Sequence, residues 1–222
     1  MLDDTIFLRQ LGIVHPQELD FPITIIGAGG IGSWATLALA KMGCRNISVL
    51  DFDKVELKNT PSQIYTLLQK GKSKVDALAE TVKQLTNVEI NPIKGRFQDE
   101  YSKIINSEVI ICGVDSLDER RSIWEKIMDE LPPHLRLYVD ARMGGEFLRI
   151  LTVNPTITDS FAKYTKSIMT KSTPHREECT ARSIVYNTFI CGGLIASLVK
   201  KIAKGEQMKA NINFDFSVLA LF

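Results

Sequence analysis

The chain has 222 residues, of which 45% are hydrophobic and 24% are charged, the ordinary composition of a globular protein. Its 27 Lys and Arg residues almost balance its 26 Asp and Glu residues, so no overall charge attracts it to nucleic acid or to an anionic membrane. The four cysteines (Cys44, Cys112, Cys179 and Cys191) form no C-x-x-C pair, which argues against a zinc ribbon and a disulfide scaffold. We therefore expect no nucleic-acid or membrane partner, and only local recognition of phosphate.

Residues 1–11 predict a short amphipathic helix, with Leu2, Ile6 and Leu8 on one side. The segment is acidic before it is apolar and lacks the hydrophobic core of a signal peptide. Together with the unpaired cysteines, this indicates a cytoplasmic protein.

From residue 23 onward, strand patterns alternate with helix patterns. The predicted strands are Ile23–Ile26, Ile47–Leu50, Val88–Pro92, Val109–Cys112 and Leu135–Val139, and the predicted helices are Ile31–Met42, Lys74–Leu85 and Ser116–Leu131. The strands are short and rich in β-branched residues, which is typical of strands buried in a parallel sheet. The alternation therefore predicts an α/β protein with a Rossmann-like, doubly wound, mostly parallel sheet.

The pattern changes after Asp140. Glu146–Val153 predicts a longer strand, Ile184–Ile202 predicts a long apolar helix, and Ile212–Leu221 alternates like a final strand, so we expect antiparallel strands to extend the sheet in its C-terminal part. The helix is roughly long enough to span a membrane, but its polar residues favour a core or a subunit interface.

We interpret residues 1–222 as a single domain. It comprises an N-terminal helical arm (1–22), a nucleotide-binding half (23–153), a polar, mobile crossover-type loop (154–180) and a C-terminal helix and strand (181–222).

The first predicted strand runs into a glycine-rich turn. Gly27, Gly29, Gly30 and Gly32 lie in a segment that satisfies G-x-G-x-x-G between a strand and a helix, the context in which this motif binds a nucleotide. Gly27 permits the tight turn, Gly29 lets the backbone approach phosphate, and Gly32 lets the helix pack against the sheet. Asp51, at the end of the second strand, can accept hydrogen bonds from ribose hydroxyls. These features fit NAD as well as ATP.

Residues further along the chain favour ATP. Asp53 and Asn59 lie in and after the acidic turn, Lys74 opens the next helix, and Asp115 follows a strand at the edge where doubly wound sheets bind ligands. A lysine and a carboxylate near phosphates suit the chemistry of a magnesium-bound triphosphate. Hydride transfer by a dehydrogenase needs neither group.

These segments together resemble the MoeB/ThiF/HesA family of ubiquitin-activating-enzyme-like proteins. The resemblance rests on GAGGIG, LDFDKVELKN, GKSKV, CGVDS and CTARSIVYNTFICGGLIASLVKKI, in that order along nearly the whole chain. Members of the family adenylate the C-terminal carboxylate of a ubiquitin-like or sulfur-carrier protein, or occasionally of a peptide. The resemblance thus implies ATP, Mg²⁺ and a small partner protein with a glycine-ended tail.

The resemblance also implies roles for individual residues. Asp51 matches the ribose-binding aspartate, Asn59 a phosphate-contacting asparagine, Lys74 the phosphate-binding lysine, and Asp115 the magnesium-binding aspartate. Arg9 matches an arginine that reaches across to the partner's ATP in homodimeric members, and it therefore implies a homodimer.

The resemblance also implies functions for Cys179 and for the segment around Gly144. Cys179 lies where sulfur-carrier activators keep a reactive cysteine; it is either an acceptor of the activated acyl group or an ordinary loop cysteine. Gly144, Gly145, Arg142 and Arg149 lie in the neighbourhood of the channel that receives the partner's tail in this family.

The sequence departs from the family pattern in two ways. Ser62 replaces an arginine that would help to bind triphosphate, and Lys58 and Lys72 are nearby cations that could substitute for it. The paired C-x-x-C zinc site of many relatives is also missing, so we expect no zinc.

The resulting hypothesis is attack of a partner's terminal carboxylate on the α-phosphorus of ATP, with Mg²⁺, Lys74 and Arg9 neutralising charge. Three alternatives stay open: a catalytically silent scaffold subunit, an NAD-dependent oxidoreductase, and a relative that activates a small molecule or a tRNA base. The loss of arginine at Ser62 motivates the first of these alternatives.

Overall fold

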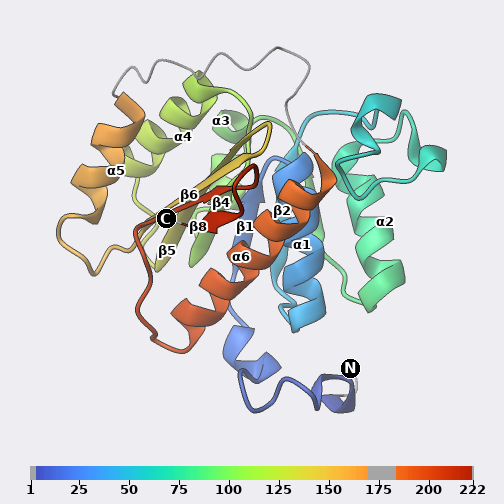
Figure 1. The fold of residues 1–222 in the computed structure, drawn as a ribbon, viewed down its shortest axis with the longest axis horizontal. Helices are drawn as coiled ribbons and strands as arrows, with labels where there is room; N and C mark the ends of the chain where they lie inside the picture. The colour runs from blue at the N-terminus through green and yellow to red at the C-terminus, as the bar shows by residue number, and fades with distance from the viewer. Residues whose placement is uncertain (1–3, 170–183, 222) are drawn as a thin grey trace.

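The computed structural model describes residues 4–169 and 184–221, and one eight-stranded sheet runs through them (Figure 1). The strands are β1 (Ile23–Ile26), β2 (Ile47–Asp51), β3 (Asn91–Lys94), β4 (Val109–Cys112), β5 (Leu137–Gly144), β6 (Phe147–Val153), β7 (Asn211–Asp215) and β8 (Ala220–Leu221), and they lie side by side in the order β3-β2-β1-β4-β5-β6-β7-β8. β1 to β5 pair in parallel, whereas β6, β7 and β8 are added antiparallel. The predicted doubly wound, mostly parallel sheet with an antiparallel C-terminal extension is confirmed.

Helices cover both faces of this sheet. The α-helices are α1 (Gly30–Met42), α2 (Lys74–Thr86), α3 (Phe97–Glu100), α4 (Leu117–Asp129), α5 (Ser160–Met169) and α6 (Val185–Ala203). Short 3₁₀ helices lie at Asp4–Phe7, Pro16–Leu19, Leu57–Asn59, Leu67–Gln69 and Tyr101–Lys103. One apolar core joins α1, α2 and α6 to one face of the sheet, and a second core joins α3, α4 and α5 to the other. Every residue of β1 and β4 is consequently buried, which explains their uninterrupted apolar sequences.

The segment after β6 corrects a prediction. Residues 154–180 were expected to be a mobile loop, but α5 occupies residues 160–169. Its Tyr164 and Ile168 are buried in the second core, and Phe161 and Tyr164 pack against the ring of Trp124. The lysines between these apolar positions obscured a helical repeat. Residues 170–183, which include Cys179, lie outside the described residues.

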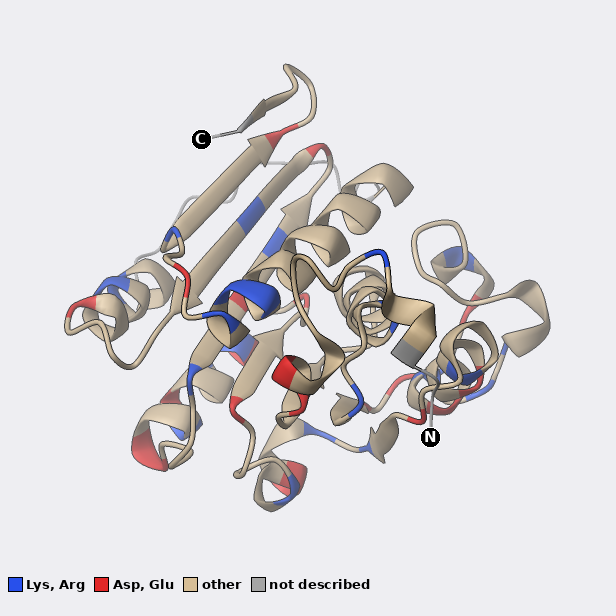
Figure 2. Cartoon of the chain, turned by 90° about the horizontal axis from the view of Figure 1, so that it is seen from below, with Lys and Arg blue, Asp and Glu red and all other residues tan. Residues whose placement is uncertain are grey.

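Both ends of the chain also differ from the expected elements. Where an amphipathic helix was expected, the described residues form a short 3₁₀ helix at Asp4–Phe7 followed by turns, and Phe7 rather than Ile6 or Leu8 is buried. The final strand is a hairpin, because the chain turns between β7 and β8 with Leu219 in the left-handed region (φ 52°). Figure 2 shows acidic and basic residues interspersed over the view, as the near balance of charge implies.

The helix α6 packs along α1. By length and composition, α6 is the one helix among the described residues that could cross a membrane. In the structure, Gly192 brings its backbone close to Trp34, and the ring of Phe189 packs edge-on against that of Trp34 with 4.1 Å between centroids. Asn187, Thr188 and Cys191 are buried in the same interface. The expectation of a helix that packs in the core is confirmed for this face of α6.

Two adjacent glycines of α6 test this close packing. A Cβ at Gly192 would lie 2.9 Å from the backbone carbonyl carbon of Trp34, whereas a Cβ at Gly193 would meet nothing within 4 Å. We expect Gly192→Ala to lower the free energy of unfolding by about 1–3 kcal/mol because the two helices must separate. Gly193→Ala should instead raise it by up to about 1 kcal/mol, since alanine favours the helix. Urea unfolding followed by circular dichroism measures both, and equal effects would contradict this packing.

Candidate functional site

The candidate site lies where the carboxyl ends of β1, β2 and β4 meet. β1 is flanked by β2 on one side and by β4 on the other, so the chain crosses to opposite faces of the sheet after these strands. Doubly wound sheets bind ligands in the crevice at such a switch point. The glycine turn follows β1, Asp51 ends β2, and Asp115 follows β4. The topology therefore brings three predicted segments to one edge.

The glycine turn depends on contacts that only glycine permits. Gly27 has φ 94°, and a Cβ there would lie 3.1 Å from the carbonyl of Gly113. A Cβ at Gly32 would lie 1.8 Å from the carbonyl oxygen of Gly27, so no side chain fits at that position. At Gly29, the N-cap of α1, a Cβ would lie 4.0 Å from the side-chain nitrogen of Gln63, its nearest neighbour, which leaves the backbone open to a ligand. The unpaired N–H groups of the first turn of α1 can then receive an anion.

Asp51 stabilises this turn through hydrogen bonds to backbone N–H groups. Its Oδ2 accepts a hydrogen bond from the backbone N–H of Ala28 (2.6 Å), and its Oδ1 accepts one from the N–H of Asp53 (2.7 Å). Burial raises the pKa of Asp51, although the charge of Lys74 and these two N–H bonds oppose the shift. Each carboxylate oxygen has a second lone pair, so Asp51 can still accept a ribose hydroxyl.

Lys74 is held at the same edge by an ion pair. Its Nζ lies 2.8 Å from Oδ2 of Asp53, and only 8% of the Lys74 side chain is exposed. Tyr65, a residue that the sequence did not single out, donates its buried hydroxyl to the carbonyl of Ala28 (2.6 Å). Burial raises the pKa of Tyr65, as do the negative charges of Asp51 and Asp53, so its hydroxyl stays protonated as a donor. The turn is thus fixed from two sides.

The carboxylates at the ends of β2 and β4 act electrostatically on Glu119 of α4. Burial raises the pKa of Glu119, and the charges of Asp115, Asp51 and Asp53 raise it further. Glu119, which the sequence did not reveal, is therefore near Asp115 and also near the carboxylates at the end of β2. Asp115 does not cap α4, because Ser116 does so by accepting the N–H of Glu119 (3.2 Å).

A metal ion at this site would need oxygen ligands from a bound nucleotide and from water in addition to those of the protein. Among residues 4–169 and 184–221, no group of three or more histidine, cysteine or carboxylate side chains is arranged to bind a metal. Mg²⁺ commonly uses one or two protein carboxylates together with water and substrate phosphates. Asp115, exposed beyond β4, fits that arrangement.

The substitution at Ser62 is not compensated by the two lysines that the sequence indicated. Lys58 pairs with Glu56 (2.8 Å) and Lys72 with Glu80 (2.7 Å), both at the surface. Another cation, Arg96, lies with its guanidinium 4.2 Å from the centroid of the Phe52 ring, beside the acidic turn. Its charge lowers the pKa of Glu119, which places it at the site.

Two other predicted site residues, Asn59 and Arg9, make no hydrogen bond to the glycine turn within the described residues. The side chain of Asn59 accepts the N–H of Glu56 (3.0 Å) and so closes the 3₁₀ turn after the acidic segment. Arg9 is exposed, next to Gln10, which donates to the carbonyl of Met42 at the far end of α1 (2.7 Å). The ends of a 13-residue helix are about 18 Å apart, so Arg9 does not reach the glycine turn of its own chain.

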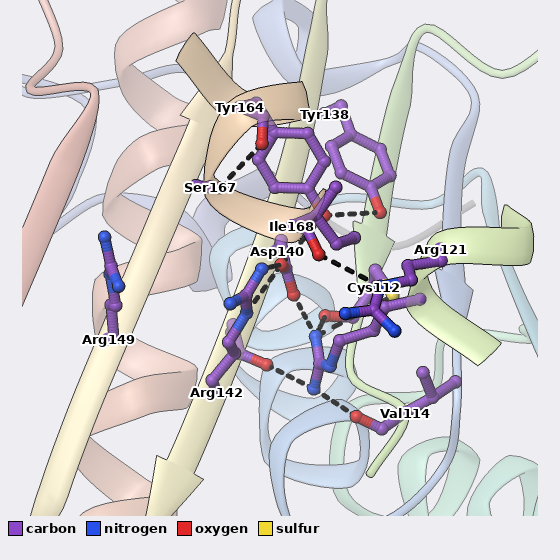
Figure 3. Close-up of polar contacts among 12 residues, drawn as sticks. Cys112, Val114, Arg121, Tyr138, Asp140, Arg142, Arg149, Tyr164, Ser167 and Ile168 are labelled. Carbon is purple, nitrogen blue, oxygen red and sulfur yellow. Dashed lines mark hydrogen bonds and ion pairs between the residues drawn. The ribbon is translucent and has the colours of Figure 1, made fainter. Parts of the chain in front are cut away.

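A buried ionic network supports the loop that carries Asp115. The guanidinium of Arg120 pairs with Asp140 and donates to the carbonyls of Val114 and Ala141, the latter at 2.9 Å. Asp140 also accepts from Arg142 Nε (2.8 Å) and from the hydroxyl of Tyr164 (2.8 Å), as Figure 3 shows. Arg120 therefore ties the residue before Asp115 to β5.

Comparison with known proteins finds a family match over most of the chain. The ThiF family model matches residues 18–220. The NEDD8-activating enzyme E1 catalytic subunit of Dictyostelium discoideum is 33% identical over 114 residues, 50% of this chain and 26% of that protein. The tRNA threonylcarbamoyladenosine dehydratase of Escherichia coli is 40% identical over 67 residues, 30% of this chain and 25% of that protein. The chain thus spans about a quarter of the length of each of these relatives.

A solved structure shares the fold. A crystal structure of E. coli MccB with AMPCPP and MccA superposes with a TM-score of 0.70 at 16% identity, over 93% of this chain and 64% of that one.

The ion pair of Lys74 gives a testable prediction. Asp53→Asn leaves a nearly buried ammonium without its closest carboxylate, so we expect it to lower the free energy of unfolding by about 1 kcal/mol. Glu80→Gln removes the partner of the exposed Lys72 and should change it by less than about 0.5 kcal/mol. Denaturant unfolding at neutral pH measures both variants. A smaller loss for Asp53→Asn than for Glu80→Gln would contradict the proposed burial of Lys74.

Proposed function

This chain belongs to the ThiF family, and on that premise we propose that it uses ATP to adenylate the C-terminal carboxylate of a small ubiquitin-like protein, sulfur-carrier protein or peptide. The observation that carries the proposal is the convergence of the glycine turn, Asp51, Lys74 and Asp115 at one edge of the sheet. The similar proteins support it, since they include a NEDD8-activating enzyme subunit and MccB, whose structure was solved with AMPCPP and MccA.

In the proposed reaction, the carboxylate oxygen attacks the α-phosphorus of ATP. A bond forms between that oxygen and phosphorus, the bond from phosphorus to the bridging oxygen breaks, and pyrophosphate leaves with the electron pair. The backbone at Gly29 and the first turn of α1 receive the phosphates, while Asp51 accepts the ribose hydroxyls. Lys74 exchanges Asp53 for a phosphate oxygen, and this ammonium neutralises charge that develops on the phosphates.

Mg²⁺, when bound at Asp115, would supply further charge neutralisation on the phosphates. Transfer of the acyl group to the thiol of Cys179 is a second step of the proposal, for a residue outside the described part of the chain. The cytoplasm is the proposed location.

Ser62 favours one alternative, a catalytically silent subunit that pairs with an active one. The position lies against the glycine turn, since the carbonyl oxygen of Ser62 would lie 3.7 Å from a Cβ at Gly30. The same carbonyl accepts the indole N–H of Trp34 (3.0 Å). The absence of an arginine side chain here removes one charge-assisted contact to phosphate, worth about 1.5–3 kcal/mol. ATP–pyrophosphate exchange separates the two functions, since a silent subunit gives none.

Binding of nucleotide by the isolated protein is the first test. We expect calorimetry to detect Mg-ATP and not NAD, and Lys74→Met to weaken ATP binding by about 10-fold or more because a charge-assisted contact to phosphate is lost. Lys72→Met is the matched control, because that lysine pairs with Glu80 at the surface. It should bind ATP as the unchanged protein does. Binding of NAD in preference to ATP would overturn the proposal.

A homodimer that shares its sites gives a second test. We propose that Arg9 acts on the nucleotide of the other protomer, because its neighbour Gln10 contacts Met42 at the end of α1 remote from the glycine turn, and α1 is about 18 Å long. Arg9→Ala and Asp115→Asn should each lose ATP–pyrophosphate exchange with a captured partner protein. After unfolding and refolding together, random pairing restores one intact site in half of the dimers, so about a quarter of the exchange should return.

The control for this mixing experiment replaces a neighbouring carboxylate. The Asp118 side chain is 91% exposed and pairs with Arg121, so Asp118→Asn should keep its exchange activity. No recovery in a mixture that forms mixed dimers would show that Arg9 does not act across the interface.

A further inference from the structure

The hairpin of β5 and β6 stands above the edge that holds the nucleotide site. β4 pairs with β5 as far as Cys112 and Asp140, and β5 then continues through residues 141–144 beyond its parallel neighbour. β6 runs back antiparallel after Gly145, which has φ 53°. Met143 packs toward Gly30, whereas Arg142, the residue before it in the strand, lies on the opposite face, where α4 and α5 pack. The hairpin is thus a wall beside the Asp115 loop.

The arginines of this wall are incompletely neutralised. Arg142 and Arg149 are directly opposite each other on β5 and β6, and Figure 3 shows Arg142 turned toward Asp140 and Arg149 apart from it. Asp140 is shared, because it also pairs with the buried Arg120. One carboxylate therefore serves two guanidinium groups, and Arg149 adds a third positive charge.

The guanidinium of Arg149 makes few polar contacts with the described residues. Its Nε donates to Oδ1 of Asn211 at 3.3 Å, and no ion pair joins it to a carboxylate within residues 4–169 and 184–221. Burial lowers the pKa of Arg149, and the charge of Arg142 lowers it further. Asp215, two positions from the residue opposite Arg149, is engaged by the N–H and hydroxyl of Ser217 (2.9 and 2.6 Å). A half-buried cation pair of this kind is complementary to an anion.

We propose that Arg149, together with Arg142, binds the side-chain carboxylate of a Glu or Asp residue in the tail of the partner that the site adenylates. The inference rests on the proposed function, and it adds a requirement for the partner's sequence. The adjoining Phe147 is 41% exposed on the same face and offers an apolar contact to the tail.

The spacing of the strands fixes the position of that acidic residue. β6 is the third strand from β1 in the sheet, so at about 4.8 Å per strand it lies about 14 Å from the strand that ends in the glycine turn. An extended tail covers about 3.3 Å per residue. The acidic residue should therefore be the third to the fifth from the C-terminus.

Fluorescence anisotropy with synthetic peptides tests this requirement. The probes are fluorescein-labelled octapeptides that end in Gly-Gly and carry one Glu, or one Gln, at the third, fourth, fifth or eighth position from the C-terminus. They are titrated with the whole protein in the presence of AMPCPP and Mg²⁺. We expect Glu to bind about 5-fold more tightly than Gln at one of positions three to five, to show no advantage at position eight, and to lose its advantage with rising salt.

Two variants locate the contact. Arg149→Gln should equalise the affinities for the Glu and Gln peptides, and it leaves the buried Asp140 network intact. Arg45→Gln removes the same charge from an exposed position before β2, at the opposite edge of the sheet, and should preserve the preference. A Glu preference that survives Arg149→Gln, or the absence of any Glu preference, would overturn the inference. ATP–pyrophosphate exchange with the same peptides tests adenylation separately, because a preserved preference without exchange contradicts only the proposed reaction.

Discussion

The site depends on backbone that packs directly against backbone. At Gly32 a side chain would collide with the carbonyl of Gly27, and at Gly27 it would press on Gly113. These contacts bring α1 down onto the ends of β1 and β4, and they leave the N–H groups of α1 facing outward. Asp51 and Tyr65 then fix the turn through the N–H and the carbonyl of Ala28. Every other group of the site is positioned relative to this turn.

The electrostatic balance around the turn gives a physical reason for a divalent cation. Four carboxylates (Asp51, Asp53, Asp115 and Glu119) face two cations (Lys74 and Arg96), so the edge is net negative before any ligand arrives. A triphosphate would meet repulsion here unless another positive charge came with it. The raised pKa of Glu119 is a sign of the same crowding of negative charge. In the proposed reaction, a magnesium ion bound to the nucleotide would offset this repulsion.

The charge balance reverses further along the sheet, on the β5–β6 wall. Arg120 and Asp140 form a buried pair that ties the Asp115 loop to β5, and Arg142 and Arg149 leave positive charge on the adjoining sheet face. The acidic edge suits a metal-bound nucleotide, whereas the basic wall suits an acidic segment of a partner. The buried carboxylate of Asp140 therefore has two effects. It holds Arg120, which positions the Asp115 loop, and it neutralises part of the positive charge of the wall by pairing with Arg142.

The amino-acid sequence by itself determined the parallel core of the fold and most of the residues that meet at the candidate site. Apolar β-branched strands and the G-x-G-x-x-G turn are local patterns, so β1, β2, β4, α1, α2 and the structural roles of Gly27 and Gly32 could be predicted from neighbours in the chain. The positions of Asp51 at the end of β2 and of Lys74 at the start of α2 follow from the same patterns. Tyr65, Glu119 and Arg96 could not, because they join the site through contacts between elements far apart in sequence. α5 was missed because its burial depends on Trp124 of another helix, and only the tertiary structure places Arg9 at the far end of α1 and Arg149 opposite Arg142. Local pattern fixes which residues form an element, but the packing of the elements decides which side chains meet.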